Sequence, residues 1–194
     1  MPSESGVPTN VRLRLMHADD IPAVVEVERR SFDKGWAATA FERELAQNRM
    51  ARYLVLETDG EITGFGGLWL MVDEAHVVTA AVRPEYRRHG LGRLIVHGLV
   101  QLAQREGMLA ATLECRVSND AARGLYRHYG FYEVGVRHKY YEDNQEDAVI
   151  MTTEELGSGT YQRRLQQLGD ELATLLPGAE VILDVCGEAV VEES

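Results

Sequence analysis

A basic, glycine-containing turn between a strand-like segment and a long apolar helix constrains this chain most. Residues 82–107 read VRPEYRRHGLGRLIVHGLVQLAQREG. Helices usually begin with Ser, Thr, Asp or Asn, and positive charge at a helix N-terminus opposes the helix dipole. Here Gly90 and Gly92 leave backbone N–H groups uncovered beside several arginines. Such a helix start binds anions, and the added arginines favour a multiply charged anion such as a pyrophosphate.

Three known anion-binding patterns compete for this turn, and a basic turn without any ligand is the fourth interpretation. A Walker loop requires Gly-Lys-Ser or Gly-Lys-Thr, and the chain contains neither. A dinucleotide fingerprint requires a third glycine, but residues 90–95 read GLGRLI. The remaining pattern, R-x-x-G-x-G directly after a strand, is present from Arg87 to Gly92.

Hydrophobic periodicity predicts an α/β (α+β) fold. Alternating or β-rich segments occur at residues 11–16, 51–58, 61–72, 73–82, 109–117, 131–141 and 146–155. Helical spacing or capping signals occur at residues 19–32, 36–48, 91–105 and 118–130. The expected order is therefore β-α-α-β-β-β-α-β-α-β-β, with a hairpin turn at Asp59-Gly60.

The pattern changes after residue 155. Residues 156–194 are expected to form an acidic C-terminal extension, with an amphipathic helix that ends at Pro177-Gly178 and an edge strand after it. From Glu154 to the end, nine acidic residues stand against two arginines, so this region carries −7 of the net charge of −11. Four roles are open for it: packing on the domain, dimerisation, recruitment of a basic partner, or covering the site.

Composition excludes several other classes. A net charge of −11 disfavours a nucleic-acid binder, which needs a basic face. The apolar stretches fall short of the ~18 residues that span a membrane, and the first ten residues lack a secretory pattern, so a cytoplasmic protein is expected. Cys115 and Cys186 belong to no CxxC pair, and the histidines share no ligand spacing, so neither a disulfide framework nor a metal site is expected.

Two further segments make the chain similar to the GNAT (GCN5-related) N-acetyltransferases. VVTAAVRPEYRRHG resembles the splayed strand and pyrophosphate loop of that family, and LECRVSNDAARGLYRHYGF resembles its second signature. The resemblance covers residues 11 to about 153 and implies a GNAT domain at 11–155. It implies a central mixed, mostly antiparallel sheet with a V-shaped opening and flanking helices. It also implies acetyl-CoA as co-substrate, contacted by Ala80, Ala81, Val82, Arg87, Arg88, His89, Gly90, Leu91, Gly92, Arg93 and Asn119.

Acetyl transfer to an amine needs a neutral nucleophile and a proton for the departing thiolate. Strand geometry allows two interpretations of Glu114 equally well: its carboxylate faces a cleft, or it pairs with Arg116 on the sheet surface. Tyr126, two helical turns beyond Asn119, is either a core aromatic or a group near the thioester sulfur. The matching family positions are the general base and the general acid, so the resemblance assigns these roles to Glu114 and Tyr126. Nothing near Cys115 in the sequence activates its thiol, so direct attack in a ternary complex is expected.

The segments SFDKGW, LECRVSN and HKYYEDNQEDAVIM most resemble RimI-like members, which acetylate the N-terminal alanine of a bacterial ribosomal protein. The resemblance implies that a protein N-terminus, from a basic ribosomal protein, enters between two walls that contain Phe32, Trp36, Tyr140 and Tyr141. These aromatics equally suit a core. Three acids lie nearby in the sequence: Asp143, Glu146 and Asp147. They could attract a positively charged N-terminus or form part of a solvated surface.

Two other functions compete with this interpretation. One is acetylation of a lysine, a polyamine or an aminoglycoside, which the likeness to peptide-acting members disfavours. The other is a non-catalytic acyl-CoA-binding module, which needs neither Glu114 nor Tyr126. The sequence leaves the oligomeric state open.

Overall fold

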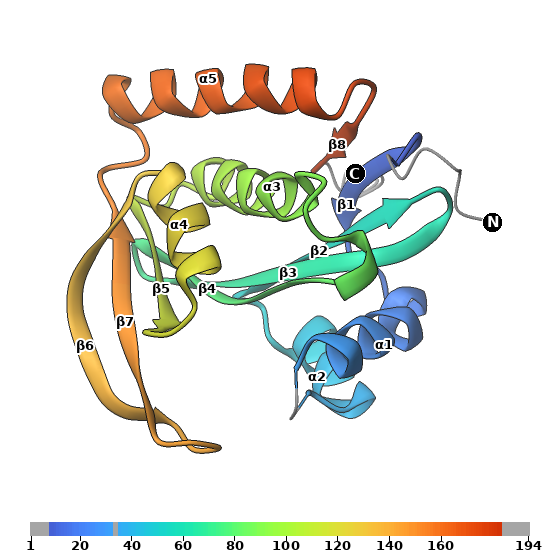
Figure 1. Ribbon diagram of the computed structural model, residues 1–194, viewed down its shortest axis with the longest axis horizontal. Helices are drawn as coiled ribbons and strands as arrows, with labels where there is room; N and C mark the ends of the chain where they lie inside the picture. The colour runs from blue at the N-terminus through green and yellow to red at the C-terminus, as the bar shows by residue number, and fades with distance from the viewer. Residues whose placement is uncertain (1–7, 33–34, 184–194) are drawn as a thin grey trace, which may run out of the picture.

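An eight-stranded mixed sheet separates two groups of helices in the computed structural model, which describes residues 8–32 and 35–183 (Figure 1). The strands are β1 (Val11–Leu15), β2 (Ala51–Thr58), β3 (Glu61–Met71), β4 (Glu74–Val82), β5 (Ala110–Arg116), β6 (Phe131–Tyr141), β7 (Glu146–Thr153) and β8 (Glu180–Ile182). The helices are α1 (Ile21–Ser31), α2 (Ala38–Gln47), α3 (Leu91–Arg105), α4 (Asp120–His128) and α5 (Gly159–Leu175). The predicted order of elements is confirmed.

The sheet order is β6-β7-β5-β4-β3-β2-β1-β8. The pairs β4–β5 and β1–β8 are parallel, and the other neighbours are antiparallel. Figure 1 shows α1 and α2 on one face of the sheet and α3 and α4 on the other, with α5 lying across the outside of α3. The sheet is thus mixed and mostly antiparallel, as the family resemblance implied.

Local signals explain where several elements begin and end. Asp59 and Gly60 both have positive φ, 52° and 87°, which is the geometry of a tight turn between antiparallel strands. The side chain of Asn119 caps α4 by accepting a hydrogen bond from the N–H of Ala122 at 3.1 Å. Ser158 caps α5 in the same way through the N–H of Tyr161, also at 3.1 Å.

The glycines in residues 64–67, which read GFGG, allow close packing on both faces of β3. A Cβ on Gly66 would lie 2.7 Å from Cγ2 of Ile95 on α3, and a Cβ on Gly67 would lie 2.3 Å from Cε1 of Tyr53 on β2. The register of β3 against β4 also shifts between Gly67 and Leu68. These glycines therefore serve packing and a strand irregularity.

The opening of the sheet follows from the short contact between β4 and β5. Their pairing covers Glu74 with Ala110, Ala75 with Ala111 and His76 with Thr112. Past that point β4 continues to Val82, while β5 remains paired with β7 on its other side. The two parallel strands therefore diverge, and one backbone edge of β4 loses its strand partner. This is the V-shaped opening that the resemblance implied.

The helix of the C-terminal extension packs on the domain. Its apolar stripe joins the hydrophobic cluster that contains α3, through Tyr161, Leu165, Leu168 and Leu172. The hydroxyl of Tyr161 donates to the backbone oxygen of Tyr129 at 2.7 Å. Beyond the helix, β8 pairs in parallel with β1 as the predicted edge strand. The boundary at residues 155/156 stays a prediction, and Cys186 lies outside the described residues.

Candidate active site

The opening between β4 and β5 leads into a cleft of about 760 Å³. Residues 77–80 of β4 and 113–116 of β5 form its inner wall, and α4 closes one side. The outer walls are formed by the end of α1 with Phe32 and Trp36, and by the hairpin between β6 and β7. Eight residues predicted from the sequence line this one cleft: Phe32, Trp36, Ala80, Glu114, Asn119, Tyr126, Tyr140 and Tyr141.

Glu114 is a buried carboxylate held by a histidine and an arginine. Nε2 of His76 lies 2.7 Å from its Oε2, and Nε of Arg137 lies 2.9 Å from its Oε1, while the Glu114 side chain is only 7% exposed. The hydrogen bond from His76, supported by the charges of His76 and Arg137, lowers the pKa of Glu114 despite its burial. The carboxylate is therefore ionised at neutral pH and fixed in orientation.

The alternative pairing of Glu114 with Arg116 is wrong. Arg116 instead binds Asp143 at 2.7 Å and Glu146 at 3.1 Å. On β5, Leu113 and Cys115 are buried, whereas Glu114 and Arg116 alternate with them. The pleat of the strand thus presents Glu114 towards the cleft region, and the sheet neighbours decide its partners.

His76 and Arg137 are missed by the sequence analysis. His76 stands on β4 at the last pair before the strands diverge, and Arg137 stands on β6, beyond β7 from Glu114. Both contacts depend on sheet order. No motif in the sequence indicates them.

Tyr126 is both a packed aromatic and part of the cleft lining, and its role near the thioester stays a prediction. Its ring packs against Phe131 with centroids 5.5 Å apart, and it also lines the cleft. Burial raises the pKa of its hydroxyl, so the phenol keeps its proton at neutral pH. Asn119 likewise both caps α4 and lines the cleft.

Cys115 also reaches the cleft, but its thiol is a poor nucleophile there. Burial raises the pKa of Cys115 to about 11, so the thiolate is scarce at neutral pH. The geometry therefore disfavours an acyl-cysteine intermediate.

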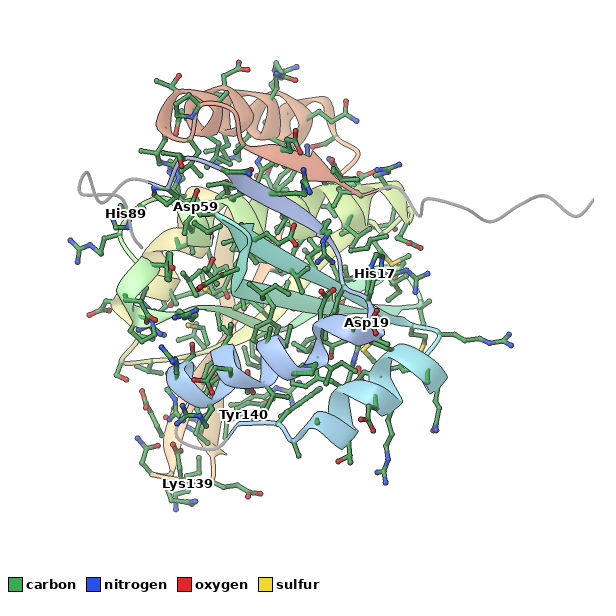
Figure 2. All side chains as sticks on the ribbon, turned by 90° about the vertical axis from the view of Figure 1, so that its right-hand side faces the viewer. His17, Asp19, Asp59, His89, Lys139 and Tyr140 are labelled. Carbon is green, nitrogen blue, oxygen red and sulfur yellow. The ribbon has the colours of Figure 1, made fainter. Side chains whose placement is uncertain are left out.

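The glycine-containing loop forms the start of α3, away from the outer walls of the cleft. Gly90 is the N-cap residue and has a φ of 83°. The N–H of Leu94 donates a hydrogen bond to the backbone oxygen of Gly90 at 3.1 Å. The N–H groups before Leu94 in this first turn are therefore free of intrahelical partners. His89 and Tyr140 lie far apart in Figure 2. The cleft lining among the described residues does not include this loop.

Several side chains assigned to the cofactor are buried or engaged elsewhere. The side chains of Ala81, Val82 and Leu91 are buried, which leaves their backbone groups for a ligand. Nε of Arg87 donates to the Val82 oxygen at 2.8 Å. Nη2 of Arg93 lies 2.7 Å from Oε2 of Glu171 on α5 and 3.0 Å from Nε2 of His128, so Arg93 is turned towards the extension. The cofactor contacts of these residues stay a prediction, as do those of Arg88, His89 and Gly92.

The aromatic residues of the outer walls are mostly exposed. Phe32, Trp36 and Tyr140 are 42%, 36% and 45% exposed, so the interpretation of these three as core residues is wrong. Tyr141 is partly covered by Arg116, whose guanidinium carbon lies 3.8 Å from the centre of the ring. The walls thus offer aromatic surface to a ligand in the cleft.

The acids of the β6–β7 hairpin are held by hydrogen bonds and ion pairs. Arg116 binds Asp143 and Glu146, and His138 lies 2.9 Å from Asp147. Hydrogen bonds hold the pKa values of all three carboxyls below their ordinary range. They therefore form an ordered network of ionised groups.

Two further polar residues of the cleft are missed by the sequence analysis. Glu28 and Ser31 on α1 both line it. A signal for Glu28 is present, because it follows Ile21, Val24 and Val27 on the apolar face of the helix, where a carboxylate is unusual.

The described part of the chain contains no cluster of three or more His, Cys, Asp or Glu side chains arranged to hold a metal ion. Its helices also include none that is long and apolar enough to cross a membrane.

Comparison with known proteins agrees with this geometry. The model of the acetyltransferase (GNAT) family matches residues 21–131. A relative from Bacillus subtilis, provisionally named a ribosomal protein bS18-alanine N-acetyltransferase, is 41% identical over 143 residues, covering 74% of this chain and 95% of its own. The Escherichia coli bS18-alanine N-acetyltransferase is 36% identical over 140 residues, covering 70% of this chain and 92% of its own.

A solved structure gives the same result. The crystal structure of the E. coli ribosomal-protein-S18-alanine N-acetyltransferase superposes with a TM-score of 0.70 at 31% identity, over 77% of this chain and 96% of that one. The family model, the relatives and the fold thus agree with one another. The chain belongs to the GNAT family of acetyltransferases.

Proposed function

We propose that this protein transfers the acetyl group of acetyl-CoA to the N-terminal α-amine of a protein, with a ribosomal-protein N-terminus that begins with alanine as the acceptor. The observation that carries the proposal is that an ionised Glu114 and a protonated Tyr126 line one cleft at the divergence of β4 and β5. The relatives named for bS18-alanine N-acetylation support the choice of acceptor.

The donor is expected to lie along the opening of the sheet. The start of α3 offers the pyrophosphate backbone N–H groups that have no intrahelical partner. The unpaired edge of β4 offers backbone groups to the pantetheine arm, as an additional strand would. A donor bound in this way would have its thioester near Tyr126, which lines the cleft from α4.

The reaction proceeds by direct attack. The neutral α-amine forms a bond to the thioester carbon, and the carbonyl electrons move onto oxygen. When this oxyanion collapses, the C–S bond breaks and the thiolate leaves with its electron pair. The hydroxyl of Tyr126 gives its proton to the sulfur and is reprotonated from solvent, while the extra proton on nitrogen passes towards Glu114. An amide and free CoA thiol result.

The contacts of Glu114 favour transfer of the proton through a water molecule over protonation of Glu114 itself. An α-ammonium group has a pKa of about 7.7–8.0, whereas the pKa of Glu114 is lowered from that of an ordinary carboxyl. Glu114 therefore holds a proton poorly at neutral pH and acts by orienting a water that carries the proton to solvent. His76 and Arg137 are positioning residues, because they fix both carboxylate oxygens.

Turnover of acetyl-CoA on short peptides, free lysine and spermidine tests this assignment. We expect peptides that begin with alanine to be the preferred acceptors. Glu114→Gln and Tyr126→Phe should each lower kcat by roughly 10²–10⁴-fold, the usual share of acid–base catalysis, with little effect on the melting temperature. Tyr132→Phe, on an exposed tyrosine of β6, is the matched control and should leave kcat unchanged.

Two results would contradict the proposal. If lysine or spermidine were the preferred acceptor, the proposed acceptor, a protein N-terminus, would be wrong. Binding of CoA with no turnover on any acceptor would indicate a non-catalytic acyl-CoA module.

A further inference from the structure

Two neighbouring polar groups of α1 point to a binding subsite with no assigned ligand. Glu28 is 5% exposed, and its Oε2 atom is buried without a hydrogen-bond partner among the described residues. Oγ of Ser31, one helical turn later, is also buried without such a partner. Both residues line the cleft. Unpaired buried polar atoms are uncommon, so this pair calls for a ligand.

The local structure holds Glu28 at this buried place. Its Oε1 atom accepts the backbone N–H of Trp36 at 3.1 Å, and a Cβ on Gly35 would lie 2.7 Å from Cγ of Glu28. Gly35 and Trp36 therefore lie close to the carboxyl group. An amide side chain would make the same hydrogen bond without placing an ionisable group at a buried position. Anchoring Trp36 therefore explains one oxygen of Glu28 but not the choice of a carboxyl group.

Glu28 differs from the other buried carboxylate of the cleft in having no ion-pair partner among the described residues. Glu114 is paired with His76 and Arg137. No Arg, Lys or His among the described residues forms a salt bridge with Glu28. Burial raises the pKa of Glu28, with the Trp36 N–H opposing this rise. A cation brought into the cleft would pair with this group and favour its ionised form.

The surroundings of Glu28 suit a cation. Phe32, Trp36 and Phe41 line the same end of the cleft, and the rings of Trp36 and Phe41 lie 5.5 Å apart. Aromatic faces attract ammonium and guanidinium groups, and a carboxylate with a hydroxyl accepts their hydrogen bonds. In the proposed reaction the acceptor peptide is the reactant that carries such a group.

We propose that Glu28 and Ser31, with the aromatic wall beside them, bind a cationic group of the acceptor peptide. The group is the N-terminal α-ammonium, bound before it loses its proton and attacks, or the side chain of a lysine or arginine next to it. This inference rests on the proposed function and names the part of the cleft that recognises the acceptor. Glu28 holds the peptide by charge, and Ser31 accepts a second hydrogen bond.

Glu28→Gln is a sharp test because the amide oxygen still accepts the Trp36 N–H. The kinetics of this variant, of Ser31→Ala and of wild type are compared on two peptides that begin with alanine, one with alanine and one with lysine at the second position. We expect Glu28→Gln to raise the peptide KM by roughly ten- to hundredfold, as expected for a lost charge-assisted hydrogen bond. Ser31→Ala should have a smaller effect in the same direction. Glu42→Gln, on an exposed residue of α2, is the matched control.

The readouts separate binding from structure. The KM for acetyl-CoA should stay unchanged, and the melting temperature of Glu28→Gln should be equal to or above that of wild type, because a buried charge has been removed. An equal loss on both peptides identifies the α-ammonium, and a loss confined to the lysine peptide identifies the side chain. Unchanged KM values on both peptides would overturn the proposal.

Calorimetry on CoA-saturated protein distinguishes failure of this proposal from failure of the proposed function. If wild type binds the peptides without turning them over, the activity is wrong, and weaker binding by Glu28→Gln still supports the subsite. If wild type neither binds nor acetylates either peptide, both proposals fail.

Discussion

Replacing Leu172 by alanine tests whether α5 is part of the hydrophobic core. Leu172 is 5% exposed and belongs to the cluster that contains α3, together with Leu165 and Leu168. Truncating such a leucine removes its buried surface and leaves a cavity, which costs about 2–5 kcal/mol. For a chain of 194 residues, each kcal/mol lowers the melting temperature by about 2–4 °C. We therefore expect a fall of roughly 6–12 °C for a cost of about 3 kcal/mol.

Leu175→Ala is the matched control within the same helix. Leu175 is 43% exposed, so the same truncation removes less buried surface and should cost about 1 kcal/mol or less. Both variants are measured by thermal and urea unfolding, with the urea midpoint giving the change in stability at constant slope. Equal and small losses for the two variants would refute the packing of α5 on α3. The extension would then behave as an appendage without a share in the core.

Two further predictions concern charges around α3. Glu171→Gln should release Arg93 from its 2.7 Å ion pair and lower the KM for acetyl-CoA by roughly two- to fivefold. The decrease in KM should be larger at low salt. An unchanged or higher KM would indicate that Arg93 does not face the cofactor. His97 is buried, and burial lowers its pKa to about 4 from an unfolded value of about 6.5, so its stabilising contribution is present above pH 6.5 and is lost as the pH falls towards 4. Relative to His97→Gln, wild type should lose about 2 kcal/mol between pH 7.5 and pH 5 in urea unfolding, whereas a constant difference would contradict a neutral buried His97.

Local chemistry in the sequence determined the elements and the first members of the site. Caps, turns and periodicity act over a few residues, so Asn119 and the Asp59-Gly60 turn mark their boundaries without knowledge of the fold. The R-x-x-G-x-G turn depends equally on local backbone freedom. Together with the family resemblance, these patterns led to Glu114 and Tyr126, which line the same cleft.

Tertiary structure decided which charges meet. His76 and Arg137 reach Glu114 because β4 and β7 flank β5 and because β6 lies beyond β7. From the sequence, Arg93 is expected to bind an anion. In the fold, α5 packs across α3 and brings Glu171 to Arg93. Strand register and helix docking depend on burial of apolar surface across the whole chain, and no short pattern encodes them.

Glu28 shows the same division within one residue. The sequence alone places it on the apolar face of α1, beside Val24 and Val27. Only the folded chain decides that one of its oxygens meets the Trp36 N–H while the other is buried without a partner among the described residues. The physical reason is that helical periodicity is a local property, whereas desolvation of a carboxylate depends on every segment that packs around it.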